Sequence, residues 1–271
     1  MKVKNTFKLL IEAVSQARLV ICRGIIMQLS KRLQAVADLV TPGNRVADVG
    51  CDHAYTSIYL AREGISPHII AMDVNPGPVS RARENILKYG CDNHIEVRRS
   101  DGLDALKENE ADTVIIAGMG GALTVQILSK HPKILKSLHE LVLQPQSEIY
   151  KVRELLSDAG FVIIEENMIK EDGKYYPMMK AIRQDNAEEG HLLKRREHNH
   201  FGRLLLEQKH PVLKEYLLWD YGICEEIMQS LSSGQSEHMH ARQKEIRDRM
   251  ALIQSGLEYY EMSPMTRRDN I

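Results

Sequence analysis

Polar residues and glycines follow several predicted β-strands of this chain, and these are the residues best suited to bind a ligand. They occur in Asp48-Val-Gly50-Cys-Asp52-His53-Ala54, Asp73, Asp101-Gly102, Ala117-Gly118-Met119-Gly120-Gly121 and Gln144-Pro145. An open α/β sheet binds its ligands in a crevice at the carboxyl ends of its strands. The recurrence of such residues at successive strand ends therefore predicts one ligand-binding crevice.

The first of these loops has a glycine that lets the backbone approach a ligand, but it lacks a phosphate-binding sequence. In the pattern G-x-G-x-x-G that begins at Gly50, Asp52 occupies the second glycine position, and Asp48 precedes the first. Two carboxylates would repel a pyrophosphate. The loop therefore favours a cationic or zwitterionic ligand end, such as an amino-acid moiety.

Two further acids point to a nucleoside. Asp73 lies 23 residues after Gly50, close to the ~20-residue offset at which an acid binds ribose hydroxyls in nucleotide-binding α/β folds. The alternative is that Asp73 caps the helix starting at Asn75-Pro76. Asp101 could accept a hydrogen bond from an adenine amino group, with Gly102 relieving crowding over the ring. An ordinary turn is the alternative there.

The segment Gly118-Met119-Gly120-Gly121 places three glycines and a methionine directly after a buried apolar strand. Where a planar base must contact the backbone, the absence of side chains creates the space, and a methionine supplies a soft, polarizable flank. The interpretation is ligand contact. The alternative is a tight helix start.

Short apolar runs alternate with segments of helical periodicity over residues 29–160. The runs predict strands at 45–49, 68–74, 95–99, 113–117 and 141–143. The helical pattern covers 29–40, 54–63, 76–89, 121–129 and 147–159. Strands that alternate with helices predict a parallel sheet covered on both faces.

Two consecutive β-like runs follow Gly160 and are expected to close the sheet as a hairpin. They are Phe161–Ile169 and Tyr175–Ile182, and the joining segment contains Asp172-Gly173. Asp-Gly between two strands is a hairpin signal. A dinucleotide-binding fold would continue with parallel strands and helices, so the hairpin argues against a dehydrogenase.

The remainder of the chain predicts two helices that pack against each other. One apolar stripe contains Leu213, Leu217, Ile223, Ile227 and Leu231, and the other contains Met239, Ile246, Met250, Ile253, Leu257 and Tyr260. Ser232-Ser233-Gly234 lies between them, which predicts an antiparallel helical hairpin with a coiled-coil seam. The predicted domains are an extension at 1–26, an α/β domain at 27–185, a helical hairpin at 186–262 and a tail at 263–271.

Composition restricts the class of protein further. The formal net charge of -1 neither indicates nor excludes a nucleic-acid partner, because a local basic face is enough to bind phosphates. Cys22, Cys51, Cys91 and Cys224 lack metal-ligand spacing, so we interpret them as structural thiols in a reducing cytoplasm and expect no metal. No stretch approaches the ~20 apolar residues of a membrane helix.

Residues 1–26 are interpreted as an upstream extension, or the product of an early start codon, ahead of a domain that begins near Met27. A basic helical appendage is the other interpretation. The segment has no small-residue cleavage site, so we do not interpret it as a signal peptide.

Taken together, the strand-end residues and the closing hairpin resemble a class I S-adenosylmethionine-dependent methyltransferase with a Rossmann-like fold. Its more specific motifs are Leu29-Ser-Lys-Arg-Leu, Asp48-Val-Gly-Cys-Asp-His-Ala-Tyr, Ile116-Ala-Gly-Met-Gly-Gly, Leu143-Gln-Pro-Gln and Glu171-Asp-Gly-Lys. They look like those of the bacterial tRNA (adenine-22-N1)-methyltransferase family. The similarity covers residues 27–183 and continues as architecture through the helical hairpin; residues 1–26 depart from it, because the family start matches Met27.

The resemblance implies methyl transfer from S-adenosylmethionine to N1 of an adenine in the D-arm region of tRNA. The expected cofactor-binding residues are Asp48, Gly50, Asp73, Asp101, Gly102, Gly118 and Gly120. The expected substrate-binding residues are Lys31, Arg32, Gly121, Gln144 and Pro145. The candidates near the transferred methyl group are Asp52, His53, Tyr55 and Met119.

Two other interpretations of the sequence stay open. One is a small-molecule methyltransferase on the same fold, with the helical hairpin used for dimerisation. The other is a non-catalytic RNA-binding adaptor that kept the cofactor crevice. For the leading interpretation we expect a cytoplasmic monomer or weak dimer, with tRNA as its partner and no membrane contact.

Overall fold

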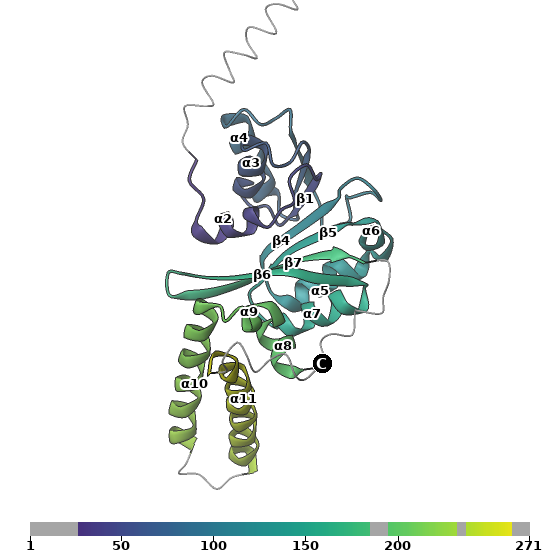
Figure 1. The fold of residues 1–271 in the computed structure, drawn as a ribbon. Coiled ribbons are helices and arrows are strands. Elements are labelled where there is room, and N and C mark those ends of the chain that lie inside the picture. Colours follow the sequence, from purple (N-terminus) through teal and green to yellow (C-terminus); the bar gives the residue numbers. More distant parts are fainter. Residues whose placement is uncertain (1–26, 185–194, 232–236, 262–271) are drawn as a thin grey trace, which may run out of the picture. The chain divides into compact units, whose positions relative to one another are not determined.

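This computed structural model of the chain describes residues 27–184, 195–231 and 237–261 (Figure 1). The predicted extension 1–26 with Cys22, the turn Ser232-Ser233-Gly234 and the tail 263–271 lie outside the described residues. Within the described part of the chain, none of the helices has both the length and the apolar character needed to cross a membrane.

The strands form a seven-stranded sheet in the order β3-β2-β1-β4-β5-β7-β6. β1 is parallel to β2 and β4, β2 is parallel to β3, and β6 is antiparallel to β7. The bounds are β1 Val46–Val49, β2 Ile69–Asp73, β3 Ile95–Arg99, β4 Thr113–Met119, β5 Glu140–Pro145, β6 Phe161–Glu171 and β7 Lys174–Arg183. The predicted mostly parallel sheet with a closing hairpin is confirmed.

The strands β4 and β5 extend beyond their predicted ends. The sequence predicts an end at Ala117 for β4, but the strand continues to Met119. It predicts an end at Leu143 for β5, and that strand continues to Pro145. The added residues include Gly118 and Pro145, and glycine and proline have low strand propensity. The local sequence therefore does not predict these extensions, which depend on the tertiary fold.

The predicted helices of the α/β region are confirmed. They are α2 Lys31–Asp38, α3 Tyr55–Arg62, α4 Pro76–Lys88, α5 Gly121–Lys130 and α7 Ile149–Asp158. Three further helices were not predicted: α6 Pro132–Ser137, α8 Arg196–Phe201 and α9 Arg203–Glu207. Each has six residues or fewer, which is too short for a helical period to be recognised.

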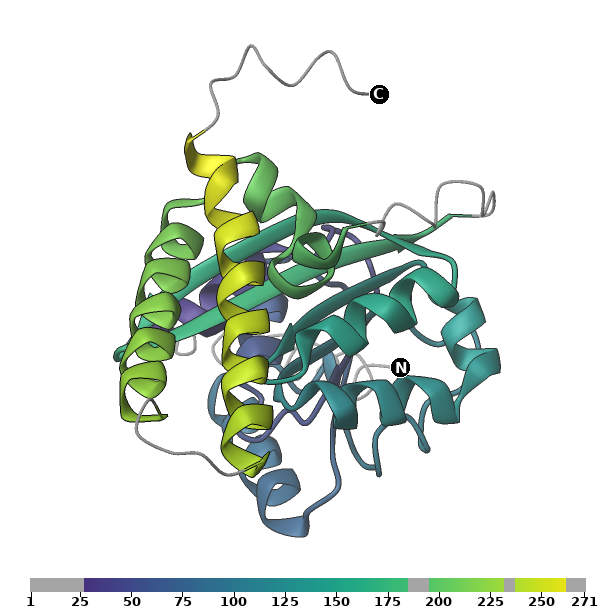
Figure 2. The ribbon, with the colours of Figure 1, turned by 90° about the horizontal axis from the view of Figure 1, so that it is seen from below.

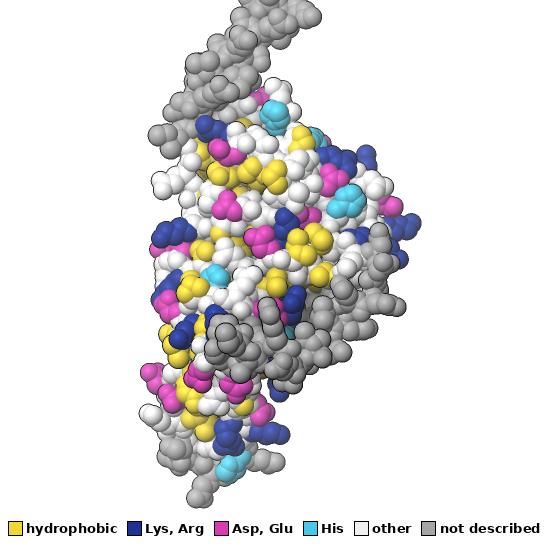
Figure 3. All heavy atoms as spheres, viewed as in Figure 1, with side chains coloured by type: hydrophobic (Ala, Val, Ile, Leu, Met, Phe, Trp, Pro, Cys, Tyr) yellow, Lys and Arg dark blue, Asp and Glu magenta, His cyan; other side chains and the backbone are white. Residues whose placement is uncertain are grey.

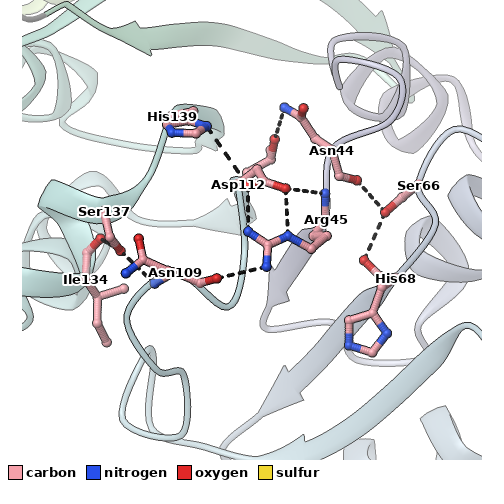
Figure 4. A network of polar contacts seen from close by, with 10 residues as sticks. Asn44, Arg45, Ser66, His68, Asn109, Asp112, Ile134, Ser137 and His139 are labelled. Carbon is pink, nitrogen blue, oxygen red and sulfur yellow. Dashed lines mark hydrogen bonds and ion pairs between the residues drawn. The ribbon is translucent and has the colours of Figure 1, made fainter.

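A polar network joins the amino ends of β1 and β4, opposite the strand ends predicted to bind ligand (Figure 4). Arg45 donates from its backbone N and from Nε to Asp112 Oδ2, each at 2.9 Å, and Arg45 Nη2 lies 2.7 Å from Oδ1. This pairing lowers the pKa of Asp112. Arg45 also donates to Asn109 O at 2.8 Å. The network therefore fixes the amino ends of the two strands and leaves their carboxyl ends for other roles.

The described residues divide into two compact units. The first runs to Gly118 and includes Gln126–Leu143, and the second comprises Met119–Val125 and the described residues from Gln144 onward. This division does not coincide with the predicted boundary at residue 185. The reason is that β6 packs against α7, α9 and α10, which groups the β-hairpin with the helices that follow it.

Within the second unit, α10 (Pro211–Leu231) and α11 (Glu237–Glu261) lie side by side as the predicted helical hairpin (Figure 2). Its seam also contains an ion pair, because Arg249 Nη2 lies 2.5 Å from Oδ1 of the buried Asp220. Asp220 lies between Leu217 and Ile223, where the first predicted stripe has no apolar residue at helical spacing. The buried side chains of this core include Leu213, Leu217, Cys224, Ile246, Ile253 and Tyr259.

A buried ion pair connects α7 and β6 to the chain segment that leads into the hairpin. Arg153 Nη2 lies 2.7 Å from Glu166 Oε1, and each side chain is 1% exposed. Arg153 also donates to the backbone oxygens of Asn199 and His200, and Leu204 N donates to Glu166 Oε2. A buried ion pair is tolerated when hydrogen bonds satisfy the remaining polar atoms of both side chains, as they do for Arg153 and Glu166.

Candidate functional site

Asp73 ends β2, and two backbone N–H groups hold its carboxylate. Asp52 N donates to Oδ2 at 3.3 Å, and Asn75 N donates to Oδ1 at 3.0 Å. The second hydrogen bond is local, but it does not make Asp73 the cap of α4, because the residue at the cap position is Asn75. Each carboxylate oxygen has two lone pairs, so both oxygens can still accept a hydrogen bond from a ligand hydroxyl.

The first loop contains three residues with a left-handed backbone conformation. Gly50, Asp52 and Ala54 have φ angles of +73°, +47° and +57°, and left-handed conformations are rare for residues other than glycine. The N–H groups of Gly50 and Cys51 both donate to Met72 O, at 2.8 and 2.9 Å. The loop is therefore fixed against the end of β2, beside Asp73.

Asp48 lies at the base of this loop as a buried carboxyl group. Ser57 Oγ donates to Asp48 Oδ2 at 2.6 Å. Burial raises the pKa of Asp48 from its ordinary value of 3.8 to about 6, the Ser57 hydrogen bond opposes this, and the negative charge of Asp73 adds to it. The folded chain therefore holds the Asp48 proton more tightly than the unfolded chain does.

We expect the Asp48→Asn substitution to change how stability depends on pH. The stabilising effect of the Asp48 proton is fully present below pH 3.8 and is lost as the pH rises through about 6. A pKa difference of this size corresponds to about 3 kcal/mol in the free energy of unfolding. Between pH 4 and pH 8 the unsubstituted chain should lose about this much free energy of unfolding, whereas the variant should not. Urea unfolding of both proteins at the two pH values measures this difference. Parallel pH curves for the two proteins would contradict the expectation, and the exposed Asp158→Asn serves as control.

Three of the four candidates for catalysis form one group beside the first loop. Arg81 Nη2 lies 3.2 Å from Asp52 Oδ1, and His53 Nε2 lies 3.5 Å from Asp52 Oδ2. The rings of His53 and Tyr55 are stacked, with centroids 5.5 Å apart and planes inclined by 11°. The Asp52 carboxylate is thus partly committed to Arg81, whereas Tyr55 is 37% exposed.

Asp101 and Gly102 follow β3 beside the end of β2, because Ser100 N donates to Asp73 O at 2.9 Å. The Asp101 carboxylate is exposed and lies 3.7 Å from Lys130 Nζ. A Cβ at Gly102, where φ is +58°, would lie 2.9 Å from Ile127 Cγ2. The positive φ and the close packing on Ile127 therefore account for a glycine at position 102 without a ligand. The contact of Asp101 with adenine stays a prediction.

In the second unit, Gly120 and Gly121 make room for the chain itself. Gly121 N donates to Ser147 O at 2.9 Å, and Gln146 N donates to Met119 O at 2.8 Å. A Cβ at Gly121 would lie 2.4 Å from Ser147 O, and one at Gly120 would lie 3.1 Å from Ser147 Oγ. The glycines thus allow the loop that follows β5 to approach closely. A base slot at Gly118–Gly121 stays a prediction.

A matched pair of substitutions tests this packing. Gly121→Ala places its methyl group against backbone atoms that cannot move aside, and we expect a loss of about 1–3 kcal/mol in the free energy of unfolding. Gly120→Ala meets only the side-chain oxygen of Ser147, which can rotate away. Urea unfolding of both variants should therefore show the larger loss for Gly121→Ala. Equal losses would contradict this account.

The remaining predicted substrate residues have different environments. Lys31 and Arg32 form the first turn of α2, a helix that packs on α3. Gln144 and Pro145 are buried in β5, and the exposed residues of the same turn are Gln146, Ser147 and Glu148. A role of these residues in substrate binding stays a prediction.

Several polar partners at this site could not be found from the sequence. Ser57 holds Asp48, Arg81 pairs with Asp52, and Asn85 Nδ2 donates to His53 O at 3.0 Å. Ser147 is the partner of Gly121. None of these residues belongs to a recognisable motif, because its position depends on how the helices and loops pack.

The described cysteines are buried, and the described residues contain no metal-binding cluster. Cys51, Cys91 and Cys224 are buried free thiols, and burial raises the pKa of Cys51. A raised pKa disfavours the reactive thiolate. Among residues 27–184, 195–231 and 237–261 there is no cluster of three or more His, Cys, Asp or Glu side chains suited to a metal ion.

Comparison with known proteins gives concordant matches. Residues 29–179 match the model of a methyltransferase domain family. The tRNA (adenine(22)-N(1))-methyltransferase of Bacillus subtilis is 35% identical over 239 residues, which cover 86% of this chain and 98% of that protein.

Solved structures give the same result. The crystal structure of the B. subtilis M1A22 tRNA methyltransferase TrmK matches with a TM-score of 0.77 and 32% identity, over 86% of this chain and 100% of that one. Streptococcus pneumoniae Sp1610, solved in complex with S-adenosyl-L-methionine, matches with a TM-score of 0.73 and 29% identity, over 85% and 100%.

Proposed function

Because this chain belongs to the tRNA (adenine(22)-N1)-methyltransferase family, we propose that it transfers a methyl group from S-adenosylmethionine to N1 of adenine 22 in tRNA. The observation that carries the proposal is the fixed pairing of Asp73 with the first loop, in a chain that matches 98% of the length of a relative with this named activity. We further propose that the enzyme works in the cytoplasm, where its tRNA substrate is found.

The residues of the first unit fit S-adenosylmethionine. Asp73 keeps acceptor capacity on both carboxylate oxygens for the two ribose hydroxyls. Gly50, with no side chain, lets the backbone approach the amino-acid end of the cofactor. Asp101 is exposed beside Asp73 and would accept from the adenine amino group. When bound, S-adenosylmethionine supplies a methyl group on a positively charged sulfur.

The chemistry demands alignment more than a strong base. N1 of adenine has a lone pair in the plane of the ring, so the task of the protein is to hold the base with this lone pair directed at the methyl group. In folded RNA that edge is often paired or stacked, and enzymes that modify bases splay the nucleotide out. Tyr55, which is exposed, would stack on the base.

Methylation leaves positive charge on the adenine ring, and acceptor groups stabilise such charge. We assign this role to Asp52 and His53. Asp52 is exposed and already lies between two cationic or titratable groups, Arg81 and His53. Beside these contacts, the exposed carboxylate keeps free lone pairs that can stabilise charge next to the first loop without the cost of burying a charge.

On the face shown in Figure 3, a tRNA would be held by local contacts rather than by one extended basic field. On the face shown in Figure 3, lysine and arginine side chains are intermixed with acidic ones over the described residues. This agrees with the net charge of -1. Affinity for tRNA should fall as salt rises, in proportion to the number of phosphates contacted.

The deciding experiment is incubation of the protein with tritiated S-adenosylmethionine and an unmodified tRNA transcript that carries adenine at position 22. We expect label in the tRNA and a reverse-transcription stop at that adenine, with no label in a transcript that carries guanine there. Cofactor binding without transfer to any RNA would contradict the proposal. Transfer to a small molecule, or RNA binding without transfer, would instead support one of the two alternative functions.

A further inference from the structure

A cavity of about 890 Å³ lies within the second unit, between the helices that follow β5 and β7 and the helical hairpin. Its wall on one side includes Tyr150 and His200, from α7 and α8. Its wall on the other side includes Tyr216 and Arg249, from α10 and α11. The volume is in the range of ligand-binding pockets, which run from about 300 to 1,000 Å³.

One wall of the cavity offers a platform for a planar ring. Tyr150 and His200 are stacked, with centroids 5.1 Å apart and planes inclined by 23°. Burial, aided by the charges of Arg196 and Arg153, lowers the pKa of His200, so its ring is neutral near pH 7. A neutral aromatic pair of this kind is the usual stacking surface for an unpaired RNA base.

The charges that line the cavity differ in whether they already have a partner. Asp220 pairs with Arg249, Glu245 with Arg242, and Glu148 with Lys151. These acids are thereby largely neutralised.

Arg196 and Asp248 also line the cavity, and both are exposed. Within the described part of the chain they have neither an ion pair nor a hydrogen bond of the side chain. A guanidinium without a partner is suited to bind a phosphate, and a carboxylate is suited to accept from the amino groups of a base.

The cavity adjoins the loop that packs on the glycine segment. Gln146 and Glu148 line it, and Ser147, between them, accepts the hydrogen bond from Gly121 N. Gln146 N in turn donates to Met119 O. The cavity wall and the segment proposed to hold the target base are therefore connected through one short stretch of backbone.

We propose that this cavity binds an unpaired nucleotide of the RNA substrate next to the methylated adenine. The base stacks on Tyr150 and His200, Arg196 binds its phosphate, and Asp248 accepts from its amino group. This inference rests on the proposed function, since it takes RNA as the substrate. It adds a second nucleotide-binding position, built entirely from the second unit.

The test compares Arg196→Gln and Tyr150→Leu with Arg247→Gln, which removes the same charge from an exposed position on α11 outside the cavity. The expected result is a KM for tRNA raised about tenfold or more by Tyr150→Leu. For Arg196→Gln we expect a smaller rise, and a slope of log Kd against log salt reduced by about one. In both variants kcat and the Kd for S-adenosylmethionine should be unchanged, and Arg247→Gln should match the unsubstituted protein.

Binding can also be followed without activity. Trp219 is the single tryptophan of the chain, is 51% exposed, and has its ring centroid 6.0 Å from that of Tyr216, which lines the cavity. We expect tRNA to change its fluorescence in the absence of cofactor, with a Kd weakened by Arg196→Gln. Because Arg196 is exposed, this variant keeps the test valid even if Tyr150→Leu does not fold.

The possible outcomes separate this inference from the proposed function. If the unsubstituted protein methylates tRNA but both variants keep its KM and salt slope, the cavity proposal is overturned and the function stands. If the unsubstituted protein methylates no tRNA, the proposed function itself fails. If adenosine or guanosine monophosphate changes the Trp219 signal while the KM for tRNA is the same in all variants, the cavity is a small-molecule site and the proposal is also overturned.

Discussion

Asp73→Ala is expected to weaken the binding of S-adenosylmethionine by at least about 100-fold. The ribose of the cofactor offers two hydroxyl groups, and hydrogen bonds to a charged acceptor contribute about 1.5–3 kcal/mol each. Loss of two such bonds exceeds the ~2.8 kcal/mol that corresponds to a factor of 100. The backbone bonds from Asp52 N and Asn75 N are lost as well, so the first loop also loses part of its support. Calorimetric titration with the cofactor measures the effect.

Two further variants separate the charge from the local structure. Asp73→Asn keeps one acceptor oxygen, enough for one of the two backbone bonds, so it should support the loop better than Asp73→Ala does and bind the cofactor with intermediate affinity. Asp158→Asn removes an equal charge from an exposed position at the end of α7 and should bind normally. If Asp73→Ala bound S-adenosylmethionine within threefold of the unsubstituted protein, the ribose role of Asp73 would be wrong.

The strands and the longer helices were predictable because each carries a strong local pattern. Val46–Val49 is apolar except for Asp48, Ile69–Met72 is apolar throughout, and all of these residues are buried, as expected for parallel strands covered on both faces. Asp172-Gly173 marks the turn between β6 and β7, and both residues have positive φ. Local propensity and the final fold agree at these positions.

The interactions that shape the site were not predictable, because they join residues far apart in the sequence. Nothing in the sequence links Arg81 to Asp52 or Ser147 to Gly121. The left-handed φ of +57° at Ala54 has no local signal either, since alanine does not favour this conformation. The glycines after β4 did indicate a close approach, but the approaching group in the described structure is the chain's own backbone.

The division into two units depends on similar long-range packing. The sequence predicts a domain boundary at residue 185. In the structure β6 contributes Met168 to the core of the helical hairpin, and Glu166 of the same strand is the acid of the buried ion pair. A sequence pattern shows that Glu166 follows a run of strand residues, but not that Arg153 neutralises it.

Arg153→Met should lower the free energy of unfolding by about 3–5 kcal/mol. The substitution leaves the carboxylate of Glu166 at 1% exposure without its cation, and an unpaired buried charge is strongly destabilising. It also removes the donors to the backbone oxygens of Asn199 and His200. The Glu166 side chain has little room to move to a new position, because Gly202 packs closely against it. A Cβ at Gly202 would lie only 2.5 Å from Glu166 Oε1. Urea unfolding followed by the fluorescence of Trp219, which belongs to the same unit, measures this loss.

The matched control is the partly exposed pair Arg203–Glu207, one helical turn apart on α9, with an Nη1–Oε2 distance of 3.1 Å and side chains 31% and 37% exposed. Arg203→Met should cost less than about 1 kcal/mol, because exposed ion pairs contribute little. The double variant Arg153→Met with Glu166→Met should recover much of the loss, since it leaves no buried charge without a partner. Two results would contradict a structural role of this pair in joining α7 and β6 to the segment before the hairpin. One is a loss below about 1 kcal/mol for Arg153→Met alone. The other is a double variant that is less stable than the single one.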